Sequence, residues 1–170
     1  MSFNDAFRAW VAEPLGMSDV TIFDWPSDIN PRPAGGATST ANDYALYLQG
    51  LLSGNFLGDY QEAMFADYTA DPVDLANTVE STTERNMEWH YAFGAWRECW
   101  SPEWTDECAE TILISSGGAF GWFPWIDLDN GYFAIIGQFG NVIARPTGQS
   151  IDLAGLIRDD IVLALAESGE

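Results

Sequence analysis

The stretch that decides the fold is residues 120–139, which read FGWFPWIDLDNGYFAIIGQF. Two runs rich in aromatic and β-branched residues, 122–126 and 132–136, flank a turn that ends in Asn130-Gly131. An Asn-Gly pair supplies the positive backbone angles that tight hairpin turns need. This stretch therefore predicts a β-hairpin of two antiparallel strands.

Two further strand candidates precede the hairpin. In residues 89–95 aromatic and small apolar residues alternate with their neighbours, and residues 111–115 form a short apolar run, TILIS. Alternation of this kind is typical of strands. We expect residues 89–139 to form a three-stranded antiparallel sheet.

Helices are predicted on both sides of this region. After the hairpin, Ser150 caps a helix over 150–167 that carries an apolar stripe. In residues 1–70 the spacing predicts a first helix that Glu13-Pro14 stops, a second after Ser39-Thr40 and a short third over 60–68. The order of helices, antiparallel strands and a closing helix indicates an α+β fold.

Residues 18–38 are rich in Pro, Asp, Ser and Gly and predict an irregular excursion, long enough to form a wall around a site. At 170 residues the chain is expected to be a single domain, 1–170. It has no run of 18 apolar residues and no secretory signal at its start. The sequence leaves the localisation open.

Charge excludes some partners. The formal net charge is -20, with 26 acidic residues, six arginines and no lysine. Such a chain repels phosphate groups, so we expect no nucleic-acid partner and no membrane partner. The composition is typical of an acidic surface suited to saline or marine, halophilic conditions.

Salt is therefore expected to stabilise the fold, because at about 0.15 M it screens like charges beyond about 8 Å. The melting temperature should rise between low and molar salt. A melting temperature that stays flat or falls would contradict this expectation.

Few catalytic arrangements are open to this sequence. His90 is the one histidine, and its place between Trp89 and Tyr91 favours an ordinary strand residue over a catalytic base. There is no Gly-x-Ser-x-Gly element, and the lack of lysine excludes a Ser-x-x-Lys nucleophile within the chain. Acidic pairs such as Asp127 and Asp129 look like turn residues.

Two other features stay open. Cys99 and Cys108 either close a short loop as a disulfide or remain free thiols, and they are thin support for a metal. Trp100 and Trp104 would offer a carbohydrate-binding platform if they were exposed.

Four segments, in order, resemble the class C β-lactamase-related serine hydrolases, a family of β-lactamases, penicillin-binding proteins and esterases. They are residues 13–19 (EPLGMSD), 34–44 (AGGATSTANDY), 91–96 (YAFGAW), and 115–121 with 125–127 (SSGGAFG and WID). The resemblance implies a partial serine β-lactamase-like fold, a single incomplete domain over 1–170. It implies no cofactor and no metal, and a parent family that is often exported or periplasmic.

By this resemblance, Ser115, Ser116, Gly117, Gly118 and Ala119 lie at the substrate. Residues 116–118 would form a sheet-edge strand, and the Ala119 amide would be the second oxyanion donor. Ser116 stands where the family carries Lys or His. The structural alternative is a glycine-rich strand packed under neighbouring aromatic side chains.

The family's Ser-x-x-Lys and Tyr-x-Asn motifs precede the first segment, and neither is in this chain. The resemblance therefore implies the C-terminal portion of such a hydrolase, inactive alone, whose parent acts on a small acyl substrate. Its expected partner is the missing N-terminal half, or a second copy through exposed sheet surface. The alternative is a non-catalytic binding or interaction protein on a degenerate hydrolase scaffold, and an enzyme with different chemistry is the least favoured reading.

Overall fold

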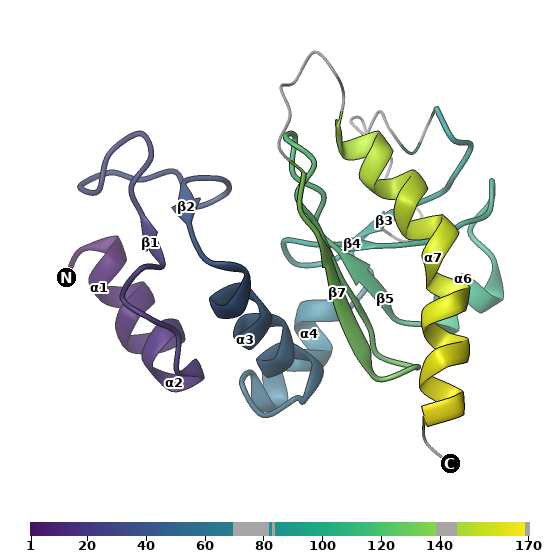
Figure 1. The fold of residues 1–170 in the computed structure, drawn as a ribbon, viewed down its shortest axis with the longest axis horizontal. Coiled ribbons are helices and arrows are strands. Elements are labelled where there is room, and N and C mark those ends of the chain that lie inside the picture. The colour runs from purple at the N-terminus through teal and green to yellow at the C-terminus, as the bar shows by residue number, and fades with distance from the viewer. Residues whose placement is uncertain (70–81, 83, 139–145, 169–170) are drawn as a thin grey trace. The chain divides into compact units, whose positions relative to one another are not determined.

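The computed structural model describes residues 1–69, 82, 84–138 and 146–168, and the chain divides into two compact units, Met1–Gln61 and Glu62–Glu170 (Figure 1). Helices and antiparallel strands make up both, which confirms the α+β class. Phe139, the last residue of the expected strand region, lies outside the described residues. Within those residues, no helix combines the length and apolar character that crossing a bilayer requires.

The first unit begins with a helical segment that continues past the expected stop. It comprises α1 (Phe3–Phe7), the π-helical turn η1 (Arg8–Ala12) and α2 (Glu13–Leu15). Pro14 lies in the first turn of α2, where a missing N–H is tolerated. The segment ends instead at Gly16, whose φ of 70° places it in the left-handed region open to glycine.

The irregular excursion after α2 contains one short regular pairing. Strand β1 (Ile22–Phe23) pairs antiparallel with β2 (Ala37–Thr38) and closes the excursion into a loop. The expected second helix is α3 (Ala41–Leu52), capped by the Thr40 side chain. After the turn η2 (Gly58–Tyr60), α4 (Gln61–Phe65) is shorter than the expected helix over 60–68.

Asp43 is the polar centre of the first unit. It is 4% exposed, and its carboxylate accepts hydrogen bonds from the Ser18 amide at 2.8 Å, the Ser18 hydroxyl at 2.6 Å and the Thr21 hydroxyl at 2.7 Å. These donors, the Ser18 hydroxyl foremost, lower the pKa of Asp43 from 3.8 to about 2. The carboxylate thereby holds the chain after α2 against the start of α3.

We expect Asp43→Asn to flatten the acid dependence of stability. A carboxyl whose pKa is lower in the folded state stabilises the fold above its unfolded pKa, and that contribution is lost as the pH falls through the folded pKa. Here the window runs from about pH 4 down to about 2. Melting temperatures measured from pH 5 to 2 should fall more steeply for the wild type than for the variant. Parallel curves would show that Asp43 contributes nothing specific.

Within its described residues, the second unit has a sheet of five antiparallel strands rather than three. They are β3 (His90–Tyr91), β4 (Trp96–Arg97), β5 (Leu113–Ser115), β6 (Phe123–Asp127) and β7 (Tyr132–Ile136), in the spatial order β3-β4-β5-β6-β7. The predicted hairpin over residues 120–139 is confirmed as β6 and β7, with Trp125 opposite Ala134. A short helix, α6 (Asp106–Glu110), lies between β4 and β5.

The four strand segments identified in the sequence become five strands because residues 89–97 fold back on themselves. Their alternating pattern predicted a single strand, but Gly94 has a φ of 81° and the Ala92 amide bonds the Ala95 carbonyl at 2.8 Å. This tight turn makes β3 and β4 a hairpin, with His90 opposite Arg97. Only glycine adopts the turn conformation readily, so Gly94 was the available sequence signal.

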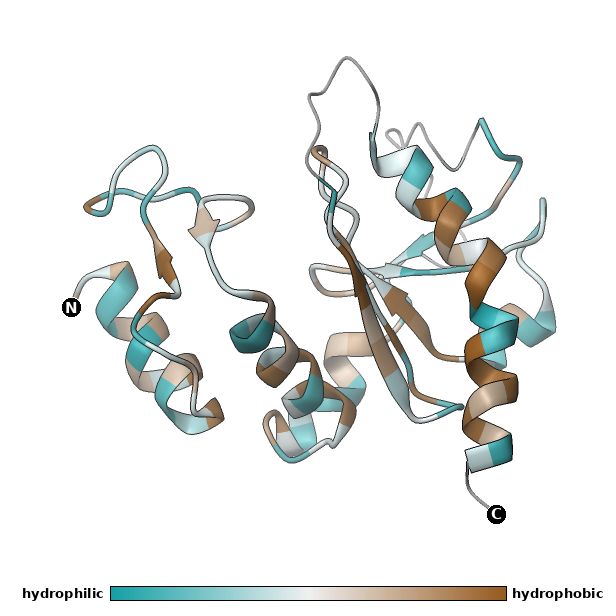
Figure 2. Ribbon diagram, in the orientation of Figure 1, coloured by the Kyte–Doolittle hydropathy of each residue, from teal (hydrophilic) through white to brown (hydrophobic). Residues whose placement is uncertain are grey.

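Helix α7 (Pro146–Ser168) packs on one face of the sheet and starts four residues before the predicted helix at 150. The core between them is formed by Trp89, Phe123, Trp125, Tyr132, Ile151 and Ala154. Figure 2 shows apolar segments along the strands and along α7. The alternation of residues in β6 and β7 thus places Phe123, Trp125 and Tyr132 under the helix.

Candidate functional site

Four of the five expected substrate residues lie in the connection between β5 and β6, which we call the glycine loop (Ser116–Trp122), and the fifth, Ser115, ends β5. The Ser116 amide bonds the Pro124 carbonyl at 3.2 Å, and the Gly118 amide bonds the Trp122 carbonyl at 2.7 Å. A β-turn over 118–121 follows, closed by the Gly121 amide and the Gly118 carbonyl at 3.0 Å.

Residues 116–118 therefore do not form the expected sheet-edge strand. Strand β5 ends at Ser115 and is an inner strand, between β4 and β6. The loop forms because Gly121, with a φ of 89°, reverses the chain in a conformation that disfavours other residues. A Cβ atom at Gly121 would also lie 2.9 Å from the Cβ atoms of Gln138 and Pro146.

Helix α7 positions the glycine loop through two hydroxyl groups. Thr147 donates to the Gly118 carbonyl at 2.6 Å, and Ser150 donates to the Gly121 carbonyl at 2.7 Å. Gln138 in turn donates to the Ser150 hydroxyl at 2.7 Å. Sequence reasoning missed these positioning residues. Ser150 was identified only as a helix cap, and the Thr-x-x-Ser spacing at the helix start was the signal that could have revealed the pair.

The five predicted site residues differ in exposure. Ser115 is buried, and its hydroxyl has no hydrogen-bond partner among the described residues. Ser116, Gly117 and Ala119 are exposed, and Gly118 is half-buried. The Gly118 amide is occupied by Trp122, whereas no hydrogen bond of the Ala119 amide occurs within the described part of the chain. Ala119 thus presents an N–H at the surface of a firmly held turn.

His90 lies apart from the glycine loop, in strand β3. Its Nδ1 is 2.5 Å from Asp67 Oδ2, and its ring stacks on Trp104 with centroids 3.7 Å apart. Burial raises the pKa of Asp67, but the hydrogen bonds from His90 and Thr69 outweigh it and the pKa is lowered. No serine, threonine or cysteine among the described residues bonds the imidazole ring, so the pair ties residues 67–69 to the sheet.

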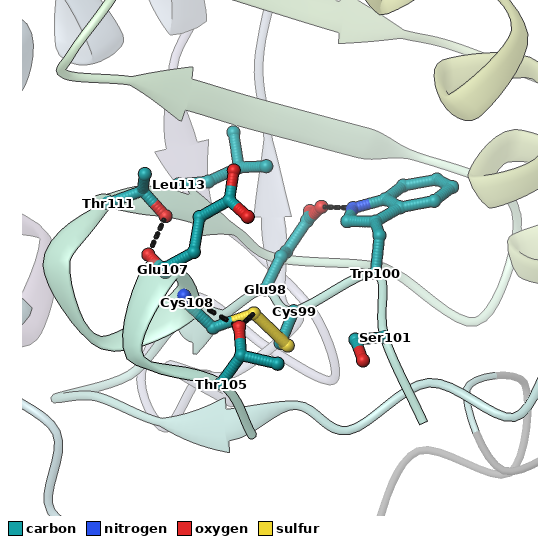
Figure 3. Close-up of a pocket in the computed structure, with 9 residues that line it drawn as sticks. All are labelled: Glu98, Cys99, Trp100, Ser101, Thr105, Glu107, Cys108, Thr111 and Leu113. Atoms are coloured by element: carbon teal, nitrogen blue, oxygen red, sulfur yellow. Dashed lines mark hydrogen bonds between the residues drawn. A yellow bond between two sulfur atoms is a disulfide. The ribbon is translucent and has the colours of Figure 1, made fainter. Parts of the chain in front are cut away.

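A hollow of about 370 Å³ lies beside Cys99 and Cys108, which form a disulfide (Figure 3). The Glu98 side chain reaches toward it, but its carboxylate accepts from the Trp100 indole at 2.6 Å and pairs with Arg158. Among the described residues no cluster of three His, Cys, Asp or Glu side chains is arranged to hold a metal ion. Of the two acidic residues that line the hollow, Glu98 and Glu107, Glu98 is therefore already paired.

The two tryptophans of this region already have packing partners. Trp104 stacks on His90, and Trp100 is 38% exposed and lies against Arg158 and Gly155, where a Cβ atom would be 2.4 Å from its ring. One face of each ring is therefore covered by other residues of the protein. This weakens the carbohydrate-platform alternative, which needs open aromatic faces.

Comparison with known proteins finds similarity among solved structures. No family model matches the chain, and no curated protein matches it. Among solved structures, the crystal structure of a putative β-lactamase from Bacteroides dorei DSM 17855 is 25% identical and superposes with a TM-score of 0.61. The fold is β-lactamase-like. The similarity covers 82% of this chain and 44% of that one, so the chain spans less than half of its length.

Within this β-lactamase-like fold, the four sequence segments meet in pairs. In the first unit, Ser18 of the first segment bonds Asp43 of the second. In the second unit, Trp96 of the third segment lies directly opposite Ser115 of the fourth. In each unit, the two segments that carry the resemblance therefore contact each other.

Proposed function

We propose that this chain is the C-terminal portion of a β-lactamase-related serine hydrolase of the class C type, and that the glycine loop forms the oxyanion side of its site. The observation that carries the proposal is the Ala119 amide, unpaired within the described residues in a turn held by Thr147. The similarity to less than half the length of a putative β-lactamase supports the part of the proposal that makes this chain one portion of a larger protein.

In the proposed reaction, a serine hydroxyl supplied by the rest of the enzyme attacks the acyl carbon of the substrate and gives its proton to a base of that same portion. The carbonyl π electrons move onto oxygen, and the Ala119 N–H donates to this oxyanion. The tetrahedral intermediate then collapses, and the leaving group departs with the proton from the base, which leaves the acyl-serine. Water, deprotonated by the same base, attacks the acyl-serine, releases the acid and returns the proton to the serine. An oxyanion donor of this kind contributes about 3 kcal/mol to lowering the barrier.

The proposal makes residue 119 the position to test. Ala119 occupies the second place of the turn over 118–121, which accepts proline, so Ala119→Pro removes the N–H while suiting the turn. We expect the variant, mixed with the polypeptide encoded immediately upstream, to hydrolyse nitrocefin or p-nitrophenyl esters about 10²- to 10³-fold more slowly than wild type.

Ala119→Ser is the matched control, because it keeps the N–H and should retain the rate of the wild-type mixture. Circular dichroism of both variants checks that the turn substitution leaves the fold intact. Equal rates for the proline and serine variants would exclude the Ala119 amide as an oxyanion donor.

A non-catalytic binding or interaction protein is the second candidate. Ser116 replaces the basic residue that the resembling family uses for a substrate carboxylate, and no described arginine bonds residues 116–121. Reversible binding of a β-lactam by the mixture, with no acyl-serine in mass spectra, would favour this function over hydrolysis.

The disulfide supports an exported parent enzyme, since disulfides persist mainly outside the reducing cytosol. Intact-mass measurement of the natively produced chain, with and without reductant, tests this. A mass that includes two thiol hydrogens before reduction would argue for a reducing compartment.

A further inference from the structure

The turn between β6 and β7 holds an asparagine followed by a glycine. Asn130 and Gly131 are both exposed, between Asp127 at the end of β6 and Tyr132 at the start of β7. A Cβ atom placed on Gly131 would have no heavy atom of the described residues within 4 Å, apart from its chain neighbours. The described residues therefore leave this pair open to water and hydroxide.

The Gly131 nitrogen is placed to act as a nucleophile. Its N–H makes no hydrogen bond within the described part of the chain, whereas the Asn130 amide donates to Asp127 Oδ1 at 2.9 Å. Glycine has no Cβ atom to shield this nitrogen, and the φ of 70° favours glycine here. The carboxamide carbon Cγ of Asn130 belongs to the preceding residue, so a bond from the Gly131 nitrogen to it closes a five-membered ring.

The Asn130 carboxamide is held through one of its two polar atoms. Its Nδ2 donates to Asp127 Oδ2 at 2.8 Å, and its Oδ1 accepts no hydrogen bond within the described residues. The start of the turn is fixed to another part of the unit, because the Leu128 amide bonds the Ile112 carbonyl at 3.1 Å. The turn is therefore anchored at its start and left free at the peptide bond that follows Asn130.

We propose that Asn130 is a site of non-enzymatic deamidation through a succinimide, a cyclic imide. Hydroxide removes the proton from the Gly131 nitrogen, which attacks Cγ of Asn130. A bond forms between these two atoms, the bond from Cγ to Nδ2 breaks, and Nδ2 takes a proton from water and departs as ammonia. Water then opens the ring. Every group that reacts, apart from water and hydroxide, belongs to Asn130 and Gly131.

Ring opening gives two products. Water that breaks the new bond to Cγ restores the peptide bond and leaves aspartate at position 130. Water that breaks the bond between the Asn130 carbonyl carbon and the Gly131 nitrogen leaves isoaspartate, in which the chain continues through the side chain and gains one main-chain atom. The two products together distinguish the succinimide route from direct hydrolysis of the carboxamide, which yields aspartate alone.

The aspartate product repels Asp127. The hydrogen bond from Nδ2 to Asp127 Oδ2 is lost, and a second negative carboxylate lies beside that of Asp127 in its place. Asp127 is 9% exposed, so water screens this repulsion less than it would screen two fully solvated charges. We therefore expect deamidation to loosen the turn that joins β6 to β7.

The test follows amide loss in the full 170-residue chain by peptide mass spectrometry during incubation at mildly alkaline pH. Asn130 should gain about 1 Da, because an oxygen replaces the amide nitrogen. This gain should be at least about tenfold faster than at Asn55, which is exposed but precedes the bulky Phe56. Asn30 is the second reference, because Pro31 has no N–H to lose. Equal rates at Asn130 and Asn55 would overturn the proposal, as would aspartate without isoaspartate at position 130.

Asn130→Gln is the matched control, because it keeps a carboxamide but would have to close a less favourable six-membered ring, so the mass gain should disappear. Asn130→Asp reproduces the first product and should melt about 2 to 4 °C below Asn130→Ala, which loses the same hydrogen bond without adding a charge. That difference should narrow in molar salt, which screens the two carboxylates. An aspartate variant as stable as the alanine variant would refute the repulsion with Asp127. If the variants fail to fold, the rates within the unaltered chain decide whether Asn130 is the site.

Discussion

The isolated chain is expected to give neither a burst nor turnover with nitrocefin or p-nitrophenyl esters. Acyl transfer of this type needs an activated serine, and removing members of such a catalytic unit lowers turnover about 10⁴- to 10⁶-fold. Ser115 is buried, and Ser116 has no hydrogen bond from its hydroxyl to a base among the described residues. His90, in β3, pairs with Asp67 and lies in another part of the second unit.

The measurement is stopped-flow and steady-state absorbance at micromolar chain, with buffer and heat-unfolded protein as references. The rate should equal that of the references. Robust ester hydrolysis that a serine-directed phosphonate blocks would show that the chain carries its own nucleophile, and the proposed division of the site would then be wrong.

Replacing Arg158 by methionine is expected to cost about 3 to 5 kcal/mol of unfolding free energy. Its guanidinium pairs with Glu98, with Nη2 3.1 Å from Oε1, and lies 4.9 Å from the centroids of the Trp100 and Trp125 rings. The Glu98 side chain is fully buried. Without Arg158, the buried Glu98 carboxylate keeps, among the described residues, only the Trp100 indole as a partner. The cost of leaving its negative charge without a counter-charge then destabilises the fold.

Urea unfolding followed by tryptophan fluorescence measures the change. Arg8→Met is the matched control, because Arg8 pairs with an Asp19 side chain that is 96% exposed, and an exposed pair contributes at most about 1 kcal/mol. Adding Glu98→Leu to Arg158→Met should recover much of the loss, since it removes the unpaired charge. Equal effects of the Arg158 and Arg8 variants would contradict a buried, structurally required ion pair.

The sequence predicted those elements whose signals are local. The Asn130-Gly131 turn between two apolar runs specified β6 and β7, and Thr40 marked the start of α3, because turn and cap chemistry act over a few residues. The Gly94 turn was hidden by an aromatic alternation that also suits one continuous strand. Periodicity alone does not distinguish a strand from a tight hairpin of the same length.

The geometry of the glycine loop could not be predicted from the sequence. Its conformation depends on hydrogen bonds from Thr147 and Ser150, about 30 positions later in the chain. Contacts between residues so far apart in the sequence depend on how α7 packs on the sheet, so no local sequence pattern predicts them. The same holds for the pairing of Glu98 with Arg158, which joins the end of β4 to α7.

The central claim, that this chain is one portion of a serine hydrolase, is tested most directly by the nucleotide sequence immediately upstream of the Met1 codon. We predict that it encodes, in frame and in this order, Ser-x-x-Lys and Tyr-x-Asn within a segment of a few hundred residues. An upstream sequence that lacks both motifs in every frame would contradict the claim and leave the β-lactamase-like fold without a hydrolase around it.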